Sequence, residues 1–198
     1  LGGIVLLNHC FFTFDNDAKK SYEKMIHLVD LAEQYLETHA PLSYDTPPLT
    51  TTNKIEELTQ IVSIIRGCEL TVKHDTSAQA RHFSTLTNLD EILKAGPLTP
   101  EHVIRTKPFP VIIDDDVAKG LREFNSAYEG YFRKHKSAQI RLDLAPRYAI
   151  IKGYGFITLA ANEKESTIIY DIVQHTQKAM LQAEMLSCWK SITPADIF

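Results

Sequence analysis

Two stretches of this chain of 198 residues share one order of predicted elements, and they constrain its fold more than any other feature. Residues 2–39 read as an apolar strand, a polar break, an aromatic-rich strand, an acidic cap and a long helix. Residues 147–189 read the same way, with one extra residue in the second break. Apolar residues recur every three to four positions in both helices, as in helices that pack on one face. The pattern predicts a layered α/β/α fold with a mostly antiparallel sheet and long flanking helices, built from two related strand–turn–strand–helix units.

The remaining sequence divides the chain further. Residues 40–53 (APLSYDTPPLTTTN) contain three prolines and five Ser/Thr residues, which is typical of a linker. We predict strands at 69–73 and 109–113, and helices at 54–66 and from 114–116 to about 135. The strands at 3–7 and 11–14 and the apolar stripes of the long helices are expected in the core. The predicted parts are a first unit (1–39), a linker (40–53), a middle region (54–146) and a second unit (147–198).

The octamer KGYGFITL, residues 152–159, nearly matches the strand motif with which RNA-recognition domains stack bases. RNA binding through Tyr154 and Phe156 is therefore one hypothesis. The net charge of −4 and pI of about 6.1 disfavour a nucleic-acid partner, and no second aromatic strand motif lies about 30 residues upstream, where that fold requires it. The simpler interpretation, which we prefer, is a tight turn whose glycines supply positive φ angles.

Cysteine usage and hydropathy indicate the cellular setting. Cys10, Cys68 and Cys188 are widely spaced and odd in number, which favours reduced thiols in a cytoplasmic protein. No apolar run approaches the roughly 20 residues that span a bilayer, so we expect no membrane partner. The chain begins without Met, directly in the apolar run GGIVLL. We expect it to be a piece of a longer polypeptide.

Several segments resemble a known family. The stretch VLLNHCFFTFDNDAKKSYEKMIHLVDLAEQYL resembles the class II aldolase/adducin-type domain, in which an apolar strand ends in Asn-His-Gly. The stretches AGPLTPEHVIRTKPFPVI, LAPRYAIIKGYGF and EMLSCWKSITPADIF are similar to the aldolase half of bifunctional rhamnulose-1-phosphate aldolase/alcohol dehydrogenase proteins. The resemblance implies the C-terminal portion of a class II aldolase-like domain in a homo-oligomer. It also implies a sugar-phosphate substrate and a parent protein in which a short-chain dehydrogenase domain follows.

In that family the histidine of Asn-His-Gly is one of three that hold zinc, and His9 occupies this position. Bound zinc acts as a Lewis acid on the negative charge that develops when a carbon–carbon bond breaks. The other two histidines form a His-x-His pair upstream with a catalytic Glu, and this sequence contains no His-x-His. The resemblance therefore implies a zinc cofactor with ligands outside this segment, which alone is expected to be inactive. Without the family, His9 reads as a hydrogen-bonded turn residue.

Two further features leave alternatives open. Cys10 stands where the family has glycine, so the backbone must tolerate a side chain there or use the thiol as a ligand. Arg105 and Lys107 could hold a sugar phosphate, although exposed basic residues beside Pro108 would look the same. The functional alternatives are a zinc-dependent aldolase that performs retro-aldol cleavage of a ketose phosphate and a non-catalytic adducin-type assembly domain. The sequence does not identify the catalytic residues.

Overall fold

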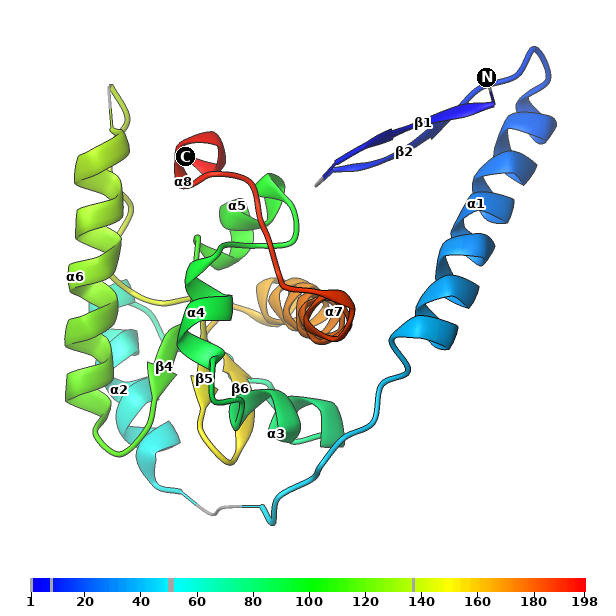
Figure 1. The fold of residues 1–198 in the computed structure, drawn as a ribbon. Helices are drawn as coiled ribbons and strands as arrows, with labels where there is room; N and C mark the ends of the chain where they lie inside the picture. Colours follow the sequence, from blue (N-terminus) through cyan, green and yellow to red (C-terminus); the bar gives the residue numbers. More distant parts are fainter. Residues whose placement is uncertain (1, 8, 50–51, 137) are drawn as a thin grey trace.

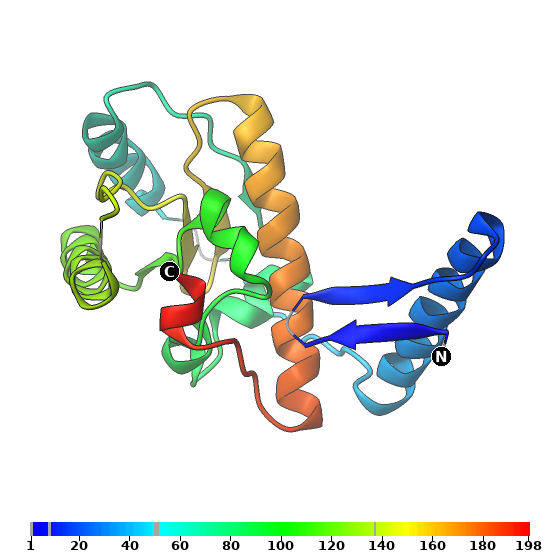
Figure 2. The same cartoon turned by 90° about the horizontal axis from the view of Figure 1, so that it is seen from above.

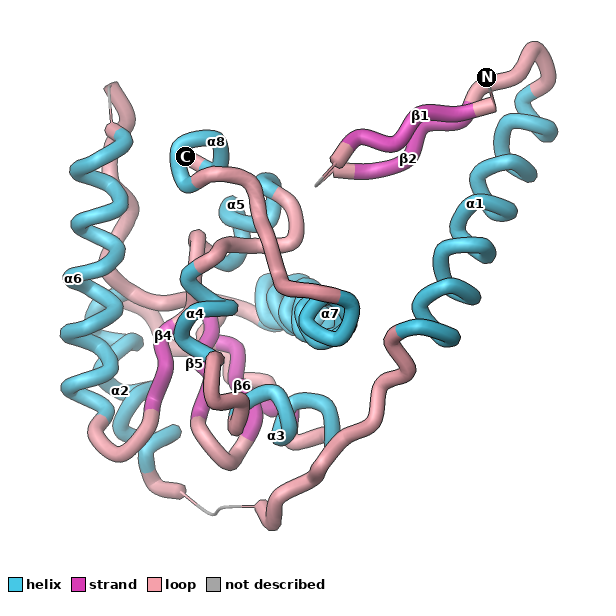
Figure 3. Tube along the Cα trace, viewed as in Figure 1, coloured by secondary structure: helices cyan, strands magenta, loops and turns pink. Residues whose placement is uncertain are grey.

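The computed structural model describes residues 2–7, 9–49, 52–136 and 138–198 of the chain. Figure 1 shows the elements coloured along the sequence, and Figure 3 shows them by type. In chain order they are β1 (Gly3–Leu6), β2 (Cys10–Thr13), α1 (Ala18–His39), α2 (Lys54–Arg66), β3 (His74–Asp75), α3 (Ala78–Ser84), α4 (Leu89–Lys94), η1 (Pro100–His102), α5 (Val103–Thr106), β4 (Val111–Ile113), α6 (Val117–His135), β5 (Tyr148–Ile151), β6 (Gly155–Thr158), α7 (Glu163–Leu186) and α8 (Pro194–Ile197).

A four-stranded sheet in the order β3-β6-β5-β4 forms the centre of the fold. The pairs β3–β6 and β5–β6 are antiparallel, whereas β4 and β5 are parallel, so the predicted mostly antiparallel sheet is confirmed. Successive side chains of a strand point to opposite faces. Tyr148 and Ile150 of β5 accordingly face one core cluster, and Ala149 and Ile151 face the other.

Helices cover both faces of this sheet, which confirms the layered α/β/α architecture. Leu58 of α2 and Phe124 of α6 pack on one face. Phe83 of α3 and Ile169 of α7 pack on the other, together with α4. The arrangement is visible in Figure 1, where α2 and α6 lie on one side of the strands and α3 and α7 on the other. The apolar stripes of α6 and α7 are core residues, as predicted.

The first segment differs from the prediction. Within the described residues β1 and β2 pair with each other and not with the central sheet. Val5 is 57% exposed and Phe12 48%, and α1 contains no buried residue. The prediction of buried strands and a core-facing α1 is therefore wrong for these elements. The physical reason is that the hairpin packs mainly on α1, and both project from the body (Figures 1 and 2).

The two predicted strand–turn–strand–helix segments nevertheless have equal spacing. Their strands begin at Gly3 and Cys10 in one and at Tyr148 and Gly155 in the other, and their helices follow at the same interval. The turns 7–9 and 152–154 are therefore equal in length, so the extra residue expected in the second break is absent. An origin of the two segments by duplication stays a prediction.

One predicted strand is misplaced. Residues 69–73 make a single bridge, Thr71 with Ala160, and the ladder resumes only at β3. The side chain of Thr158 explains the interruption, because its hydroxyl oxygen accepts the Lys73 N–H at 2.9 Å. A side chain thus satisfies a donor that the ladder would otherwise use.

Candidate functional site

His9 lies in the turn between β1 and β2, where the register pairs Leu6 with Cys10. The His9 N–H donates to the Leu6 carbonyl at 3.2 Å, so a backbone bond closes the turn. Asn8, the other polar residue of the predicted motif, lies outside the described residues. The turn therefore presents His9 at the tip of the hairpin.

This tip reaches toward the body of the protein. His9 Nδ1 lies 3.2 Å from Oε1 of Glu101, which belongs to η1. Figure 2 shows the turn of the hairpin directed at α7 and the neighbouring short helices. The side chains are 44% and 53% exposed, so the contact is open to solvent. Two segments far apart in sequence thus meet at His9.

Glu101 is stabilised as a carboxylate by its own helical turn. The segment begins at Thr99, with Pro100 at the first helical position, where the missing N–H of proline has no cost. A hydrogen bond from the Glu101 backbone N–H and a second from the Thr99 side chain hold the pKa of Glu101 below its usual value. The nearby His9 adds to this effect when it is charged.

Two further histidines lie in this region. His102 follows Glu101 directly, and its Nδ1 is buried without a hydrogen-bond partner. Burial lowers the pKa of His102, and His175 of α7 lowers it further, while Glu101 acts in the opposite direction. Neutral imidazole is therefore the favoured form of His102 at neutral pH. The spacing of the histidines in the sequence suggests no common site. The structure nevertheless brings His102 and His175 close enough to interact.

A groove of about 510 Å³ lies beside these residues, between α1 and α7. Its walls are mostly apolar side chains of the two helices, and Phe11 of β2, Leu98 and His175 also line it. The groove therefore lies between the hairpin–α1 segment and α7.

The described residues do not assemble a complete metal centre. No group of three or more His, Cys, Asp or Glu side chains that could hold a metal ion occurs among them. A catalytic zinc site uses three protein ligands and an open position. His9 fits one ligand position, since it lies at a strand end and its imidazole is partly exposed. The donor set of the described residues does not complete the site.

Cys10 does not require the left-handed backbone that a glycine would supply. Among the described residues Lys107 is the non-glycine residue with a positive φ, so Cys10 lies in an ordinary region. In the second hairpin the corresponding residue is Gly155, whose φ is 129°. All three cysteines are free thiols, and Cys10 is exposed.

The two residues predicted to hold phosphate are not on one surface. Arg105 is exposed, whereas Lys107 is buried with 3% of its surface accessible. Lys107 Nζ donates to the Asp143 carbonyl and lies 4.2 Å from the centre of the Tyr128 ring. Its backbone, with φ at 61°, directs the side chain inward. The sequence could not distinguish this geometry from an exposed lysine.

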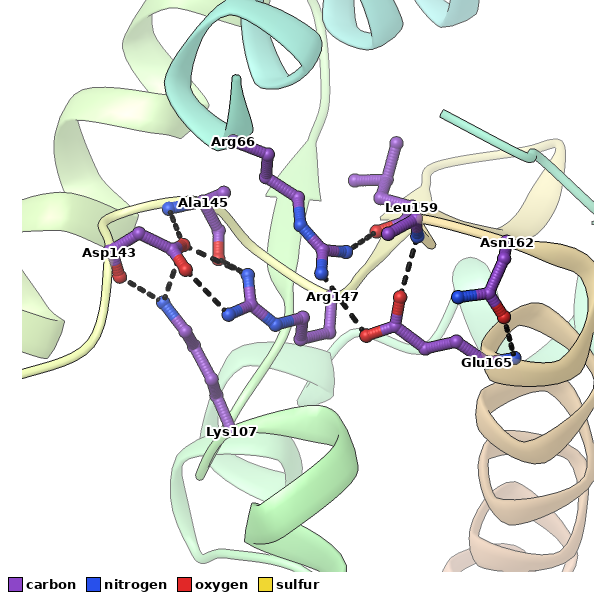
Figure 4. A network of polar contacts seen from close by, with 9 residues as sticks. Arg66, Lys107, Asp143, Ala145, Arg147, Leu159, Asn162 and Glu165 are labelled. Atoms are coloured by element: carbon purple, nitrogen blue, oxygen red, sulfur yellow. Dashed lines mark hydrogen bonds and ion pairs between the residues drawn. The ribbon is translucent and has the colours of Figure 1, made fainter. Parts of the chain in front are cut away.

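Lys107 belongs to a polar network that joins several elements (Figure 4). Arg147 donates two parallel hydrogen bonds to the Asp143 carboxylate, at 2.9 and 2.7 Å, and Lys107 Nζ lies 3.6 Å from the same carboxylate. At the other end, Arg66 bonds the Leu159 carbonyl at 2.8 Å and pairs with Glu165 at 3.2 Å. Bidentate arginine pairs are among the stronger polar contacts in proteins. The network ties α2, α7 and the loop before β5 to the sheet.

Opposing effects set the pKa values in this network. Burial lowers the pKa of Lys107 to about 7, with a further contribution from the charge of Arg147, and Asp143 offsets only part of this. Burial raises the pKa of Asp143, but the hydrogen bonds and charge of Arg147 outweigh it and hold the value at about 2. The burial of Lys107 and its charged neighbours explain its shifted pKa. We therefore interpret this network as structural and not as a functional site.

The octamer forms the turn between β5 and β6 and the strand β6. Gly153 and Gly155 have φ angles of 75° and 129°, which confirms the interpretation as a glycine turn. Phe156 is buried and contacts the Tyr170 ring, and the Tyr154 hydroxyl lies 2.8 Å from His74 Nδ1. Neither aromatic ring forms an open stacking platform.

The acidic residues 114–116 have structural roles. Asp116 caps α6 by accepting the Lys119 N–H at 2.8 Å, and Asp114 pairs with Lys152 at 2.7 Å. Asp115 is fully exposed. The predicted helix start therefore accounts for Asp116, whereas Asp114 and Asp115 lie before the helix and are near Lys152 and Lys54, respectively.

No helix in the described part of the chain is long and apolar enough to cross a membrane.

Comparisons with known proteins identify a family and several similar proteins. Residues 50–198 match the family described as "Aldolase class II, second domain". An uncharacterized oxidoreductase of Bacillus subtilis strain 168, YuxG, is 24% identical over 179 aligned residues, which cover 78% of this chain and 26% of the relative. The chain thus spans about a quarter of the length of that protein.

Two solved structures of YgbL, for which aldolase, epimerase or decarboxylase activity has been suggested, are also similar. The protein from Klebsiella pneumoniae has a TM-score of 0.43 at 15% identity, over 64% of this chain and 55% of the other. The protein from Escherichia coli has a TM-score of 0.40 at 14% identity, over 67% and 65% of the two chains. The family match covers well over half of the residues. This chain therefore belongs to the class II aldolase family, with residues 50–198 forming the second-domain region.

Proposed function

We propose that this chain is part of a zinc-dependent class II aldolase that performs retro-aldol cleavage of a ketose phosphate. The observation that carries the proposal is the position of His9, at the tip of a hairpin and directed at η1 and α7, in a chain of the class II aldolase family. Zinc, when bound, would supply Lewis-acid stabilisation of negative charge on the substrate.

The residues of this chain would position the metal and the substrate. His9 would provide one imidazole ligand, and the two further protein ligands would come from outside the described residues, since these hold no complete set. The apolar groove between α1 and α7 would accommodate an apolar neighbouring segment of the protein rather than the polar substrate. Arg105 is exposed and remains available to a phosphate, whereas Lys107 is bonded to Asp143 and is not.

The wider protein is also a matter of proposal. The printed description of YuxG names an oxidoreductase, and this chain covers only 26% of it. A parent that combines an aldolase with a dehydrogenase domain is consistent with that ratio. We further propose a homo-oligomer in the cytoplasm, as the family resemblance suggests.

A non-catalytic assembly domain is the second candidate. The exposed apolar side chains of β1, β2 and α1 favour it, because such surfaces are typical of protein–protein contacts. A Glu and a His-x-His pair in the sequence that precedes Leu1 in the parent would favour the enzyme. Their absence would favour the assembly domain.

Zinc stoichiometry on the full-length protein tests the proposal. We expect the wild-type protein to retain zinc after dialysis and the His9→Ala variant to lose it, because three ligands are required for stable binding. His27→Ala is the matched control, since His27 is an exposed residue of α1, and it should retain zinc. Wild-type protein without zinc, or a His9→Ala variant with unchanged zinc, would refute the proposed function.

A further inference from the structure

The chain that leads from α1 toward α2 is bound to the body over its first part. Leu42 and Tyr44 are half-buried against the core cluster to which α3 and α7 contribute, and Ala40 is fully buried. In Figure 1 this chain runs from the end of α1 past α3 before it reaches α2. We call residues 40–47 the strap, and β1, β2 and α1 together the arm. The strap thus joins the arm to one particular surface of the body.

Three polar contacts hold the strap on α3, and each joins a residue of the strap to a side chain of the helix. They link Tyr44 Oη to Gln79 Oε1 at 3.0 Å, the Asp45 carbonyl oxygen to His82 Nδ1 at 3.2 Å, and the Pro47 carbonyl oxygen to Arg81 Nη1 at 2.8 Å. The contacts are spread along the strap, so they fix its direction as well as its position. Proline adds stiffness at Pro47, because its ring fixes φ.

The helix that receives the strap is firmly anchored. Ala80 and Phe83 of α3 are fully buried in the core beneath it. Gln79 also donates through Nε2 to the Gln174 carbonyl of α7 at 2.9 Å, which ties α3 to the neighbouring helix. The side chains that hold the strap therefore have fixed positions, and the strap adapts to them.

Direct contacts between the arm and the body are weak by comparison. His9 and Glu101 are both about half exposed, and exposed charged pairs contribute little to stability. The groove of about 510 Å³ lies between α1 and α7, and none of the described residues of α1 is buried. The arm therefore gains little from packing on the body, and the strap is the main restraint on its orientation.

We propose that the strap is a conformational lock, which holds the arm in one orientation for as long as residues 40–47 stay bound to α3. With the strap bound, Leu42 anchors the chain three residues after α1 ends at His39. With the strap detached, the chain is free over residues 40–53, and a flexible chain of this length has an r.m.s. end-to-end distance of about 20 Å. The contact of His9 with Glu101 then has to overcome this added chain freedom, so it opens. Contacts on α3 thus control the tip of the hairpin.

Pulsed electron–electron double resonance on the full-length protein measures the separation of arm and body. Spin labels are attached at Lys20→Cys of α1 and Lys134→Cys of α6, both exposed positions. The native cysteines are replaced by serine, and labelled protein is diluted with unlabelled protein so that only distances within one chain are recorded. We expect one narrow distance distribution. In the variant Tyr44→Phe/Arg81→Ala, which lacks two of the three strap contacts, the distribution should broaden to a width of about 20 Å.

Two controls separate release of the strap from general damage. Tyr22→Phe/Arg122→Ala changes the same residue types at exposed positions and should keep the narrow distribution. A second label pair within the body, Lys119→Cys on α6 and Lys164→Cys on α7, should give the same narrow distance in every variant. None of these measurements requires a bound metal, so they are independent of the proposed function.

The outcomes decide the proposal in either direction. A narrow arm-to-body distribution in Tyr44→Phe/Arg81→Ala, or a broad one before any strap contact is removed, would refute the lock. If the body pair broadens in that variant, the substitution at Arg81 has disturbed α3 itself. Tyr44→Ala, which changes only the strap, then decides in the same way: a broad arm-to-body distribution with an unchanged body pair supports the lock, and a narrow one refutes it.

Discussion

The Asp143 carboxylate offers the sharpest stability test in the structure, because it accepts two hydrogen bonds from Arg147 and is also the ion-pair partner of Lys107. Asp143→Asn keeps the size of the side chain but removes its charge. Lys107 would then lie buried without a counter-ion, since 2% of its side chain is accessible. We expect the variant to be less stable than the wild type at pH 6, where both the lysine and the wild-type carboxylate are charged.

The magnitude follows from the pKa of Asp143. A fall from 3.8 to about 2 corresponds to about 2.5 kcal/mol, since one pKa unit equals about 1.4 kcal/mol. The side chain is 36% exposed, and solvent screening reduces the value to about 1.5 kcal/mol. Because the folded-state pKa lies below the unfolded one, this contribution is present above about pH 4 and is lost as the pH falls through about 2.

Urea denaturation at pH 6 measures the change in the free energy of unfolding. Asp115→Asn is the control, because Asp115 is fully exposed and surface substitutions usually change stability by less than about 0.5 kcal/mol. The double variant with Lys107→Met should lose less stability than the sum of the two single variants, by about 1 kcal/mol, because the two residues contact each other. An Asp143→Asn variant as stable as the control, or strict additivity, would refute the reasoning.

Two other predictions concern single residues. Gly155→Ala should destabilise the protein by about 3 kcal/mol in denaturation experiments, because the new Cβ would lie 2.1 Å from the Asp75 carbonyl oxygen at a φ of 129°. Gly130→Ala in α6, where nothing lies within 4 Å, should instead be neutral or stabilising by up to about 1 kcal/mol, and equal effects of the two would contradict the argument. The pKa of Lys107 is about 7 in the folded protein, whereas its ordinary value, expected in the unfolded chain, is 10.5. Between these two pH values the unfolded chain therefore binds more protons than the folded protein. Wild-type stability relative to Lys107→Met should therefore rise by about 2 kcal/mol from pH 7 to 9, and a flat difference would show that Lys107 remains charged.

Local structure was predictable where a residue type specifies its own geometry. An acidic cap was predicted before the first long helix, and Asp17 fills this role, as Asn162 does for α7: their side chains accept backbone N–H groups of the first turn. Gly67 ends α2 in the left-handed region. These features depend on contacts between near neighbours in the sequence.

Long-range features were not predictable in the same way. The apolar periodicity of α1 correctly gave a helix, but periodicity does not say whether a partner covers the face. The contact of His9 with Glu101 and the inward direction of Lys107 each depend on which segments meet in three dimensions. One signal was available for Glu101, since Thr99-Pro100 predicts a helical turn that holds the next acidic residue in a fixed position.

The isolation of the β1–β2 hairpin has a consequence for work with the protein in solution. Both outer strands of this ribbon carry unpaired backbone N–H and C=O groups within the described residues, beside exposed side chains such as Val5 and Phe12. Free edges of this kind are templates for strand addition by another chain. At high concentration the hairpin is where copies of this segment would pair first. A charged residue placed on the exposed face of β1 would keep the segment monodisperse without touching the central sheet.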